Sequence, residues 1–353
     1  MSAHDRLIAD FAAGRKAALA RAISIVENHR AGFEQLLALW HPRLGRARRI
    51  GITGPPGAGK STLTTGLTRA YRAQGLTVGI VAVDPTSPFT GGALLGDRIR
   101  MEDVALDDGV YIRSLATRGS LGGLSAATRE TCDVLDAFGI DRILIETVGV
   151  GQSELDVART ADTSLVVLVP ESGDSIQTLK AGLMEIADVF AVNKSDRPGA
   201  DRLRNEIEVM LGMRGGATMR NVPAHHGVDL SANNIAKQAR LAAAADDTAR
   251  WTPPVLRTAA AKDEGIGELV TALDRHFRYL EDSGTLRVRR RTRLRERVVE
   301  VVEDKVRRRL WADAATNAWL EERLTELETG TATPFAIADD LLERSADLLT
   351  RNS

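Results

Sequence analysis

The sequence has little cysteine, no long apolar run and almost no net charge. Its 353 residues include one cysteine, Cys132, which excludes an intramolecular disulfide and favours a reducing cytoplasm. The formal net charge of −1 gives no overall field that would attract nucleic acid or a membrane surface. No apolar run approaches membrane-spanning length, and the first residues lack the charged-then-apolar pattern of a signal peptide. We therefore expect a cytoplasmic protein without a nucleic-acid or membrane partner.

A phosphate-binding loop is the clearest motif that the chain does contain. Residues 54–61 match the pattern G-x-x-x-x-G-K-[ST], in which glycines let backbone N–H groups turn towards phosphate oxygens. A predicted strand over 49–53 and a predicted helix over 61–74 provide the setting that this loop requires. We predict a nucleoside triphosphate site whose phosphate-binding residues are Gly54, Gly57, Ala58, Gly59, Lys60, Ser61 and Thr62.

A second motif indicates which base is bound. The predicted buried strand 189–192 leads into Asn193, Lys194 and, two residues on, Asp196, the N-K-x-D arrangement of guanine-specific P-loop proteins. A carboxylate at the last position can accept hydrogen bonds from N1–H and N2–H of guanine, a donor pair that adenine lacks. The loop after the predicted strand 254–257 could place a backbone N–H on the guanine oxygen; its residues are Thr258, Ala259 and Ala260.

Acidic residues follow two further predicted strands. Residues 77–83 lead to Asp84, and the strand that begins at Ile143 ends in Glu146. Acids at the carboxyl ends of strands lie where ligands collect in open α/β sheets, so both are candidates for binding Mg²⁺. Asp97, in a glycine-flanked loop, is a third candidate. For each acid, helix capping or a solvated position is the alternative.

A possible switch segment begins three residues after Glu146. Gly149 could donate its N–H to the γ-phosphate and act as a hinge. In Ras-like proteins a glutamine follows this glycine and orients the attacking water, but here Val150 follows it and Gln152 lies nearby. We therefore expect slow hydrolysis by the chain alone, with acceleration by a partner or by an ordered loop.

Three regions are predicted along the chain. Residues 1–45 form a helical extension, residues 46–282 alternate strands and helices, and residues 283–353 are helical again. The predicted fold is an α/β P-loop NTPase with a mostly parallel sheet, helices on both faces, and helical extensions at both ends. A run of arginines begins at Arg287, but an apolar stripe at helical spacing and interspersed acids favour a solvated or subunit-packing helix over nucleic-acid binding.

Taken together, these motifs resemble the MeaB/ArgK family of P-loop GTPases. The match includes both nucleotide motifs, the loop after residue 83, residues 97–101 and the segment 146–154, and it extends over most of the chain. Members are G-protein chaperones of adenosylcobalamin-dependent acyl-CoA mutases. The resemblance therefore implies hydrolysis of GTP to GDP and phosphate with Mg²⁺, and a mutase partner of the methylmalonyl-CoA or isobutyryl-/hydroxyisobutyryl-CoA type. It also implies a homodimer formed through the C-terminal helices, and no cobalamin bound by this chain itself.

The resemblance carries roles to individual residues. The loop 170–180 matches an additional switch of the family, with Asp174 and Lys180 as contacts that signal to the mutase. The segment 212–250 is longer than in many members, which leaves the client mutase open. The resemblance also implies Mg²⁺ or switch roles for Asp84, Asp97 and Glu146, and guanine reading by Asn193, Lys194 and Asp196. With the motif reading added, the candidate catalytic residues are Lys60, Asp84, Glu146, Gly149 and Gln152, and the candidate metal ligands are Ser61, Asp84, Asp97 and Glu146.

Two other functions compete with a GTPase chaperone. A small-molecule kinase using ATP is disfavoured by the N-K-x-D motif, and no acceptor site with its own base stands out. A nickel-inserting GTPase would need Cys and His ligands, which one cysteine and six scattered histidines do not supply.

Overall fold

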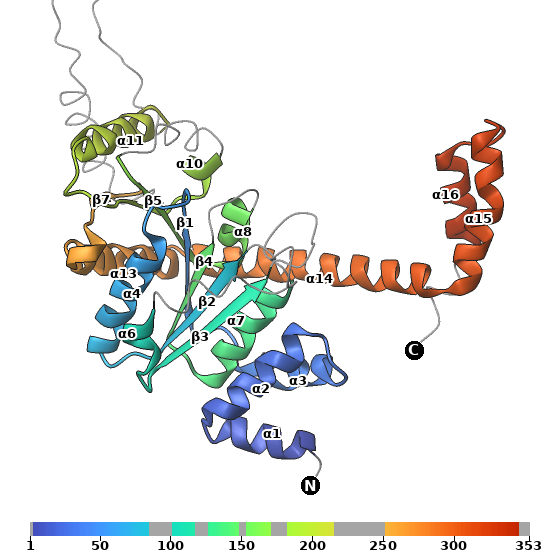
Figure 1. The fold of residues 1–353 in the computed structure, drawn as a ribbon, viewed down its shortest axis with the longest axis horizontal. Helices are drawn as coiled ribbons and strands as arrows, with labels where there is room; N and C mark the ends of the chain where they lie inside the picture. Colours follow the sequence, from blue (N-terminus) through green and yellow to red (C-terminus); the bar gives the residue numbers. More distant parts are fainter. Residues whose placement is uncertain are drawn as a thin grey trace, which may run out of the picture. The chain divides into compact units, whose positions relative to one another are not determined.

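Seven parallel strands form one sheet at the centre of the chain (Figure 1). The computed structural model describes residues 3–84, 101–116, 126–147, 153–170, 182–214 and 251–345. These form two compact units, residues 1–286 and 287–353. The strands, all in the first unit, are β1 (Arg48–Thr53), β2 (Val78–Asp84), β3 (Val110–Ala116), β4 (Arg142–Thr147), β5 (Thr163–Leu168), β6 (Val189–Val192) and β7 (Val255–Arg257).

The strand order places the phosphate-loop strand in the middle of the sheet. The order is β3-β2-β4-β1-β5-β6-β7, and every neighbouring pair is parallel. In this register Ile52 of β1 lies opposite Glu146 of β4 and Leu165 of β5. The carboxyl ends of the strands therefore meet at one edge, where the predicted nucleotide motifs follow β1, β4 and β6.

Helices cover both faces of the sheet, because the inner strands are apolar on both sides and cannot face water. One face packs against α4 (Lys60–Ala73), α6 (Glu102–Ala105) and α13 (Ile266–Asp282), and the other against α7 (Ala126–Phe138) and α8 (Ser153–Thr160). Towards β6 and β7 the sheet packs against α11 (Ala200–Arg214), with the short α10 (Met184–Ile186) beside it. The predicted α/β fold class, with its mostly parallel sheet, is confirmed.

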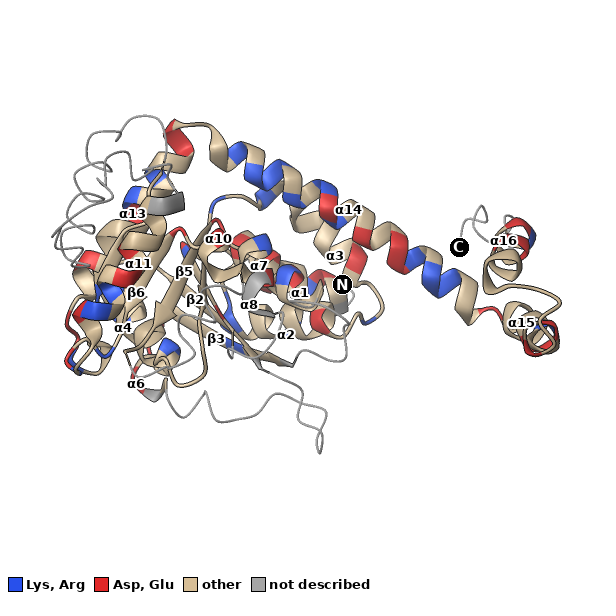
Figure 2. Cartoon of the chain, turned by 90° about the horizontal axis from the view of Figure 1, so that it is seen from above, with Lys and Arg blue, Asp and Glu red and all other residues tan. Residues whose placement is uncertain are grey.

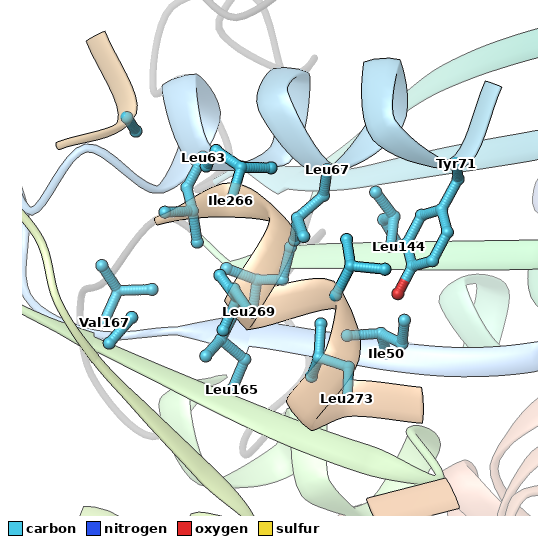
Figure 3. Packing of buried hydrophobic residues seen from close by; sticks show 14 of the residues in the cluster. Ile50, Leu63, Leu67, Tyr71, Leu144, Leu165, Val167, Ile266, Leu269 and Leu273 are labelled. Carbon is cyan, nitrogen blue, oxygen red and sulfur yellow. The ribbon is translucent and has the colours of Figure 1, made fainter. Parts of the chain in front are cut away.

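The helix after the phosphate loop is fixed by a tight apolar contact. Leu63, Leu67 and Tyr71 recur every four residues on one side of α4, and all three are fully buried. They meet Leu269 and Leu273 of α13 and the side chains of the central strands (Figure 3). This contact holds the first turn of α4 against the sheet, so the loop before it has a rigid support.

The N-terminal helices belong to the same compact unit as the sheet. They are α1 (Ala3–Ala12), α2 (Lys16–Glu27) and α3 (Phe33–Trp40), followed by the 3₁₀ turn η1 (His41–Arg43). Phe11 stacks on Trp40 with ring centroids 4.1 Å apart and meets the edge of Phe138 in α7 at 5.0 Å. The buried carboxylate of Asp136 then accepts hydrogen bonds from the backbone N–H groups of Gly45, Arg46 and Ala47, at 2.8, 3.1 and 2.9 Å.

The second unit is helical. It comprises most of α14 (Thr285–Ala312), with α15 (Ala314–Glu328) and α16 (Pro334–Arg344). Basic side chains lie along the first part of α14 and in its last turns, with most of its acidic side chains between them (Figure 2), and ion pairs form, such as Arg308–Asp304 at 2.9 Å. The predicted apolar stripe is exposed at Val298 and Val302, with 63% and 54% of each residue accessible, whereas Leu310 is buried. Both helical extensions are confirmed, while the boundaries of the three predicted regions stay predictions.

Among the described helices, none has the combination of length and apolar character that crossing a membrane requires.

Candidate functional site

The phosphate loop lies between β1 and α4, in a conformation that demands glycine at two positions. Gly54 and Gly59 have φ angles of +138° and +84°, in the region that side chains rarely adopt. A Cβ atom on Gly54 would lie 2.0 Å from the carbonyl oxygen of Val167, and one on Gly59 would lie 2.4 Å from Nδ2 of Asn193. The loop is thus pressed against β5 on one side and against the N-K-x-D segment on the other.

Lys60 is folded into this loop. Its side chain is buried, and Nζ donates hydrogen bonds to the carbonyl oxygens of Gly54 and Pro55, at 2.8 and 3.0 Å. Lys60 is also the first residue of α4, whose N-terminal N–H groups and helix dipole favour an anion. A positive charge and a helix N-terminus therefore lie together where the motif predicts phosphate. Thr62, in the same turn, is exposed.

Ser61 and Glu146 are brought together at the carboxyl ends of β1 and β4. The Ser61 hydroxyl donates a hydrogen bond of 2.6 Å to Oε1 of Glu146, and both residues are buried. Carboxylate and hydroxyl oxygens are donors that suit Mg²⁺. Among the described side chains, no three of the His, Cys, Asp and Glu type converge on a metal site. A Mg²⁺ ion here would need further oxygen ligands beyond these two side chains.

Asn193 connects the phosphate loop to the loop after β7. Its Nδ2 donates a hydrogen bond of 2.8 Å to the carbonyl oxygen of Ala58. Its Oδ1 accepts from the Thr258 hydroxyl at 3.2 Å and from the Ala260 N–H at 3.1 Å. The side chain therefore connects the two loops through hydrogen bonds to both.

The three backbone N–H groups predicted to meet the guanine oxygen all donate within the protein. Thr258 donates to Val192 at 2.9 Å, Ala259 to Glu264 at 3.1 Å, and Ala260 to the Asn193 side chain at 3.1 Å. A guanine oxygen would have to share or replace one of these hydrogen bonds, and the assignment stays a prediction.

The end of the N-K-x-D segment forms a tight turn. Lys194 has a φ angle of +54°, and its carbonyl oxygen accepts from the Arg197 N–H at 3.0 Å. Asp196, which follows in this turn, has an exposed carboxylate that forms an ion pair of 2.9 Å with Nζ of Lys262. The hydrogen bond to the ammonium group lowers the pKa of the Asp196 carboxyl and raises the pKa of Lys262.

Several predicted site residues lie outside the described parts of the chain. They are Asp97, Gly149 and Gln152, together with Asp174, Lys180 and most of the segment 212–250. Asp84 is the last residue of β2, and because Val83 lies opposite Thr147 of β4, the backbone of Asp84 is at the same edge of the sheet as Glu146. Their assigned roles stay predictions.

Sequence reasoning missed three residues that shape the site. Lys262 was not singled out as the partner of Asp196, and Asp263 was not expected to bind Arg69 of α4, a contact of 2.6 Å. The hydrogen bonds that Asp136 makes to the chain entering β1 were not foreseen either. All three act between segments far apart in the sequence, so no local spacing could have indicated them.

The family model that matches this chain and two of its relatives are described as GTPases. The family model described as "Methylmalonyl Co-A mutase-associated GTPase MeaB" matches residues 19–315. A protein of Pyrococcus horikoshii is 43% identical over 340 residues, which cover 96% of this chain and 98% of the relative. The Escherichia coli protein named "GTPase ArgK" is 34% identical over 325 residues, covering 91% and 90%.

One solved structure is similar over almost its whole length. It is described as "Crystal structure of LAO/AO transport system kinase" and has a TM-score of 0.65 at 27% identity, covering 97% of this chain and 98% of that one. The resemblance drawn from the motifs is confirmed by these matches. With a phosphate loop and an N-K-x-D segment joined through Asn193 at one edge of the sheet, the chain belongs to the MeaB family of methylmalonyl-CoA mutase-associated GTPases.

Proposed function

We propose that this GTPase acts as a chaperone that gates cofactor loading and protects an adenosylcobalamin-dependent acyl-CoA mutase in the cytoplasm. The family's association with methylmalonyl-CoA mutase supports this client. An isobutyryl- or hydroxyisobutyryl-CoA mutase is the alternative client. The observation that carries the proposal is the pair of hydrogen bonds by which Asn193 joins the phosphate loop to the loop after β7. A protein whose activity is controlled by its bound nucleotide needs such a connection between the parts that bind phosphate and base.

The chemistry is transfer of the γ-phosphoryl group of GTP to water. A water oxygen attacks the γ-phosphorus, the bond to the β–γ bridging oxygen breaks, and GDP and phosphate leave. Lys60 and the N–H groups at the start of α4 stabilise the negative charge on the phosphate oxygens as that bond breaks. Gln152 is the proposed residue for orienting the water, and Gly149 the hinge that senses the γ-phosphate.

The buried pair of Ser61 and Glu146 supports a Mg²⁺ site. Both side chains present oxygen donors, 2.6 Å apart, beside the phosphate loop. When bound, Mg²⁺ would neutralise charge on the β- and γ-phosphate oxygens. Asp84 and Asp97 are the further acids proposed to hold it in one or other nucleotide state, directly or through water. Cobalamin stays with the mutase in this proposal.

Coupling to the mutase and dimer formation are assigned to separate parts of the chain. The loop 170–180 is the proposed switch that signals to the mutase, through Asp174 and Lys180. The exposed stripe on α14, with Val298 and Val302, is the proposed contact with a second copy of the chain. Burying such a stripe against its own copy would remove apolar surface from water.

Turnover measurements test this proposal. GTP hydrolysis is measured alone and with a mutase loaded with adenosylcobalamin, and we expect the mutase to raise kcat at least about tenfold. ATP should be turned over poorly, and phosphate should be released without any added acceptor, which distinguishes hydrolysis from a small-molecule kinase. If no cobalamin mutase from the same organism stimulates turnover, the protein has a different client.

Two substitutions in the loop 170–180 test its part in this stimulation. Asp174→Ala and Lys180→Ala should weaken the stimulation while leaving GTP affinity nearly unchanged, since neither residue is assigned to phosphate or guanine. Equal stimulation of the wild type and both variants would remove the loop from the mechanism.

A further inference from the structure

The loop after β7 holds a lysine in a fixed position beside the guanine-reading segment. The 3₁₀ turn η3 (Ala260–Lys262) is closed by a hydrogen bond of 2.8 Å from the Lys262 N–H to the Ala259 carbonyl oxygen. Asp263 follows with a φ angle of +57°, and its carboxylate binds Arg69 of α4 at 2.6 Å. The backbone of Lys262 is thereby anchored to the helix that carries the phosphate loop.

The Lys262 side chain reaches across to Asp196. Nζ lies 2.9 Å from Oδ2 of the Asp196 carboxylate, and the two side chains are 54% and 36% exposed. The same carboxylate is the group that would accept both donors of a guanine base. The Lys262 ammonium group therefore already binds the carboxylate that would accept hydrogen bonds from guanine.

We propose that Lys262 is a specificity-determining residue of the base site, because it is bound to one oxygen of Asp196 and competes for that oxygen with one of the two guanine donors. The proposal rests on the proposed reading of guanine by Asp196. Guanine presents N1–H and N2–H, so it needs both carboxylate oxygens, whereas hypoxanthine presents N1–H alone and can use the oxygen that Lys262 leaves open. The ion pair thus opposes guanine more than hypoxanthine, and it sets how strongly the site discriminates between them.

The position of the ion pair makes this competition feasible. Lys262 is more than half exposed, so water can solvate its ammonium group after release. Exposed ion pairs are also screened by salt, so discrimination in favour of guanine should rise with ionic strength as long as Lys262 is present.

Titration with GDP and inosine diphosphate tests the proposal. Both nucleotides carry the same phosphates, so the ratio of their Kd values reports the base site alone. Lys262→Met keeps the length of the side chain and removes the charge, and we expect it to raise the ratio Kd(inosine diphosphate)/Kd(GDP) about two- to fivefold, the range open to an exposed ion pair. Lys262→Arg restores the cation and should return the ratio towards the wild-type value.

Two controls make the experiment specific. Lys16→Met removes another partly exposed lysine that forms an ion pair, with Asp108 at 3.6 Å, and should leave the ratio unchanged. The effect of Lys262→Met should also disappear in an Asp196→Asn background, since it acts through that carboxylate. Thermal unfolding of each variant checks that the fold is kept.

The outcomes separate this inference from the function on which it rests. A wild-type protein that does not prefer GDP to inosine diphosphate or ADP contradicts guanine reading itself. If the wild type prefers GDP but Lys262→Met leaves the ratio unchanged or lowers it, only the role of Lys262 is wrong. An effect that persists in the Asp196→Asn background overturns it as well.

Discussion

At the scale of single residues, the motifs indicate which side chains matter but not what they touch. The pattern places Lys60 at phosphate, and the structure adds that Nζ is held by two carbonyl oxygens of its own loop. The pattern places Asn193 at the base, whereas its amide is used to join two loops. A motif records residue type and spacing, and partners from distant segments are fixed only when the chain folds.

Replacing the loop lysine should abolish most activity. Lys60→Ala removes the positive charge that faces the β- and γ-phosphates, so we expect GTP turnover to fall at least about 10²-fold. Phosphate release by the purified variant is the measurement, with circular dichroism to verify folding. Lys16→Ala serves as the control and should turn over GTP normally. Near-normal turnover by a folded Lys60→Ala protein would contradict the phosphate-loop assignment.

Replacing the base-reading carboxylate should change the preferred base. Asp196→Asn exchanges an acceptor oxygen for an amide that can donate to the extra carbonyl group of xanthine. We expect GTP affinity to drop on the order of 10²-fold and affinity for xanthosine triphosphate to rise. Direct titration with both nucleotides measures the change. A wild-type protein that prefers ATP to GTP would show that the base assignment is wrong.

At the scale of helices and strands, apolar periodicity predicts most elements around the site. The predicted strand 49–53 and helix 61–74 agree with β1 and α4 to within one residue at each end, and strand 189–192 is the same as β6. Strand β3 and the strand order were not predicted. Periodicity reports which face of an element is apolar, whereas the order of strands depends on which faces meet after collapse.

A buried acid of α7 holds the chain that enters β1, and its replacement tests how much this contact contributes. Asp136 accepts three backbone hydrogen bonds from residues 45–47 and contacts Arg49 at 3.2 Å. Asp136→Ala leaves those donors without this acceptor and removes one of the two carboxylates at the partly buried Arg49 guanidinium, so the free energy of unfolding should fall by about 3–5 kcal/mol. Urea denaturation measures the loss.

The control for this change lies one turn away on the same helix. Asp133 also binds Arg49, at 2.8 Å, but its side chain is 33% exposed. We expect Asp133→Ala to cost about 1 kcal/mol or less. Equal losses for the two variants would show that the hydrogen bonds of Asp136 to residues 45–47 contribute little.

At the scale of the whole molecule, the sequence predicts the helical regions at both ends, but only the structure shows which of their apolar residues are buried. The spacing of apolar residues along α14 predicts a helix with one apolar face. It could not indicate that Leu310 is buried while Val298 and Val302 remain accessible. Burial depends on whether another element lies over the stripe, and a pattern within one helix carries no information about that.

A charge in the stripe should prevent self-association. Val302→Glu in the full chain introduces a carboxylate into the proposed contact between two copies, where it would be buried without a partner. We expect a dimer for the wild type and a shift to monomer for the variant in analytical ultracentrifugation, with GDP affinity retained. Arg308→Glu lies about 120° around the same helix and should leave the assembly unchanged. A wild-type monomer would rule out the proposed dimer.

The exchange of GDP for GTP is where the Asn193 link has its largest consequence. Because one amide binds both Ala58 and Ala260, neither loop can retreat from a bound nucleotide without breaking a hydrogen bond to Asn193. The protein's contacts with the base and with the phosphates should therefore be lost together, in a single kinetic step. A protein that pulls on the loop after β7 would then accelerate release at the phosphate end, some distance from the point at which it binds.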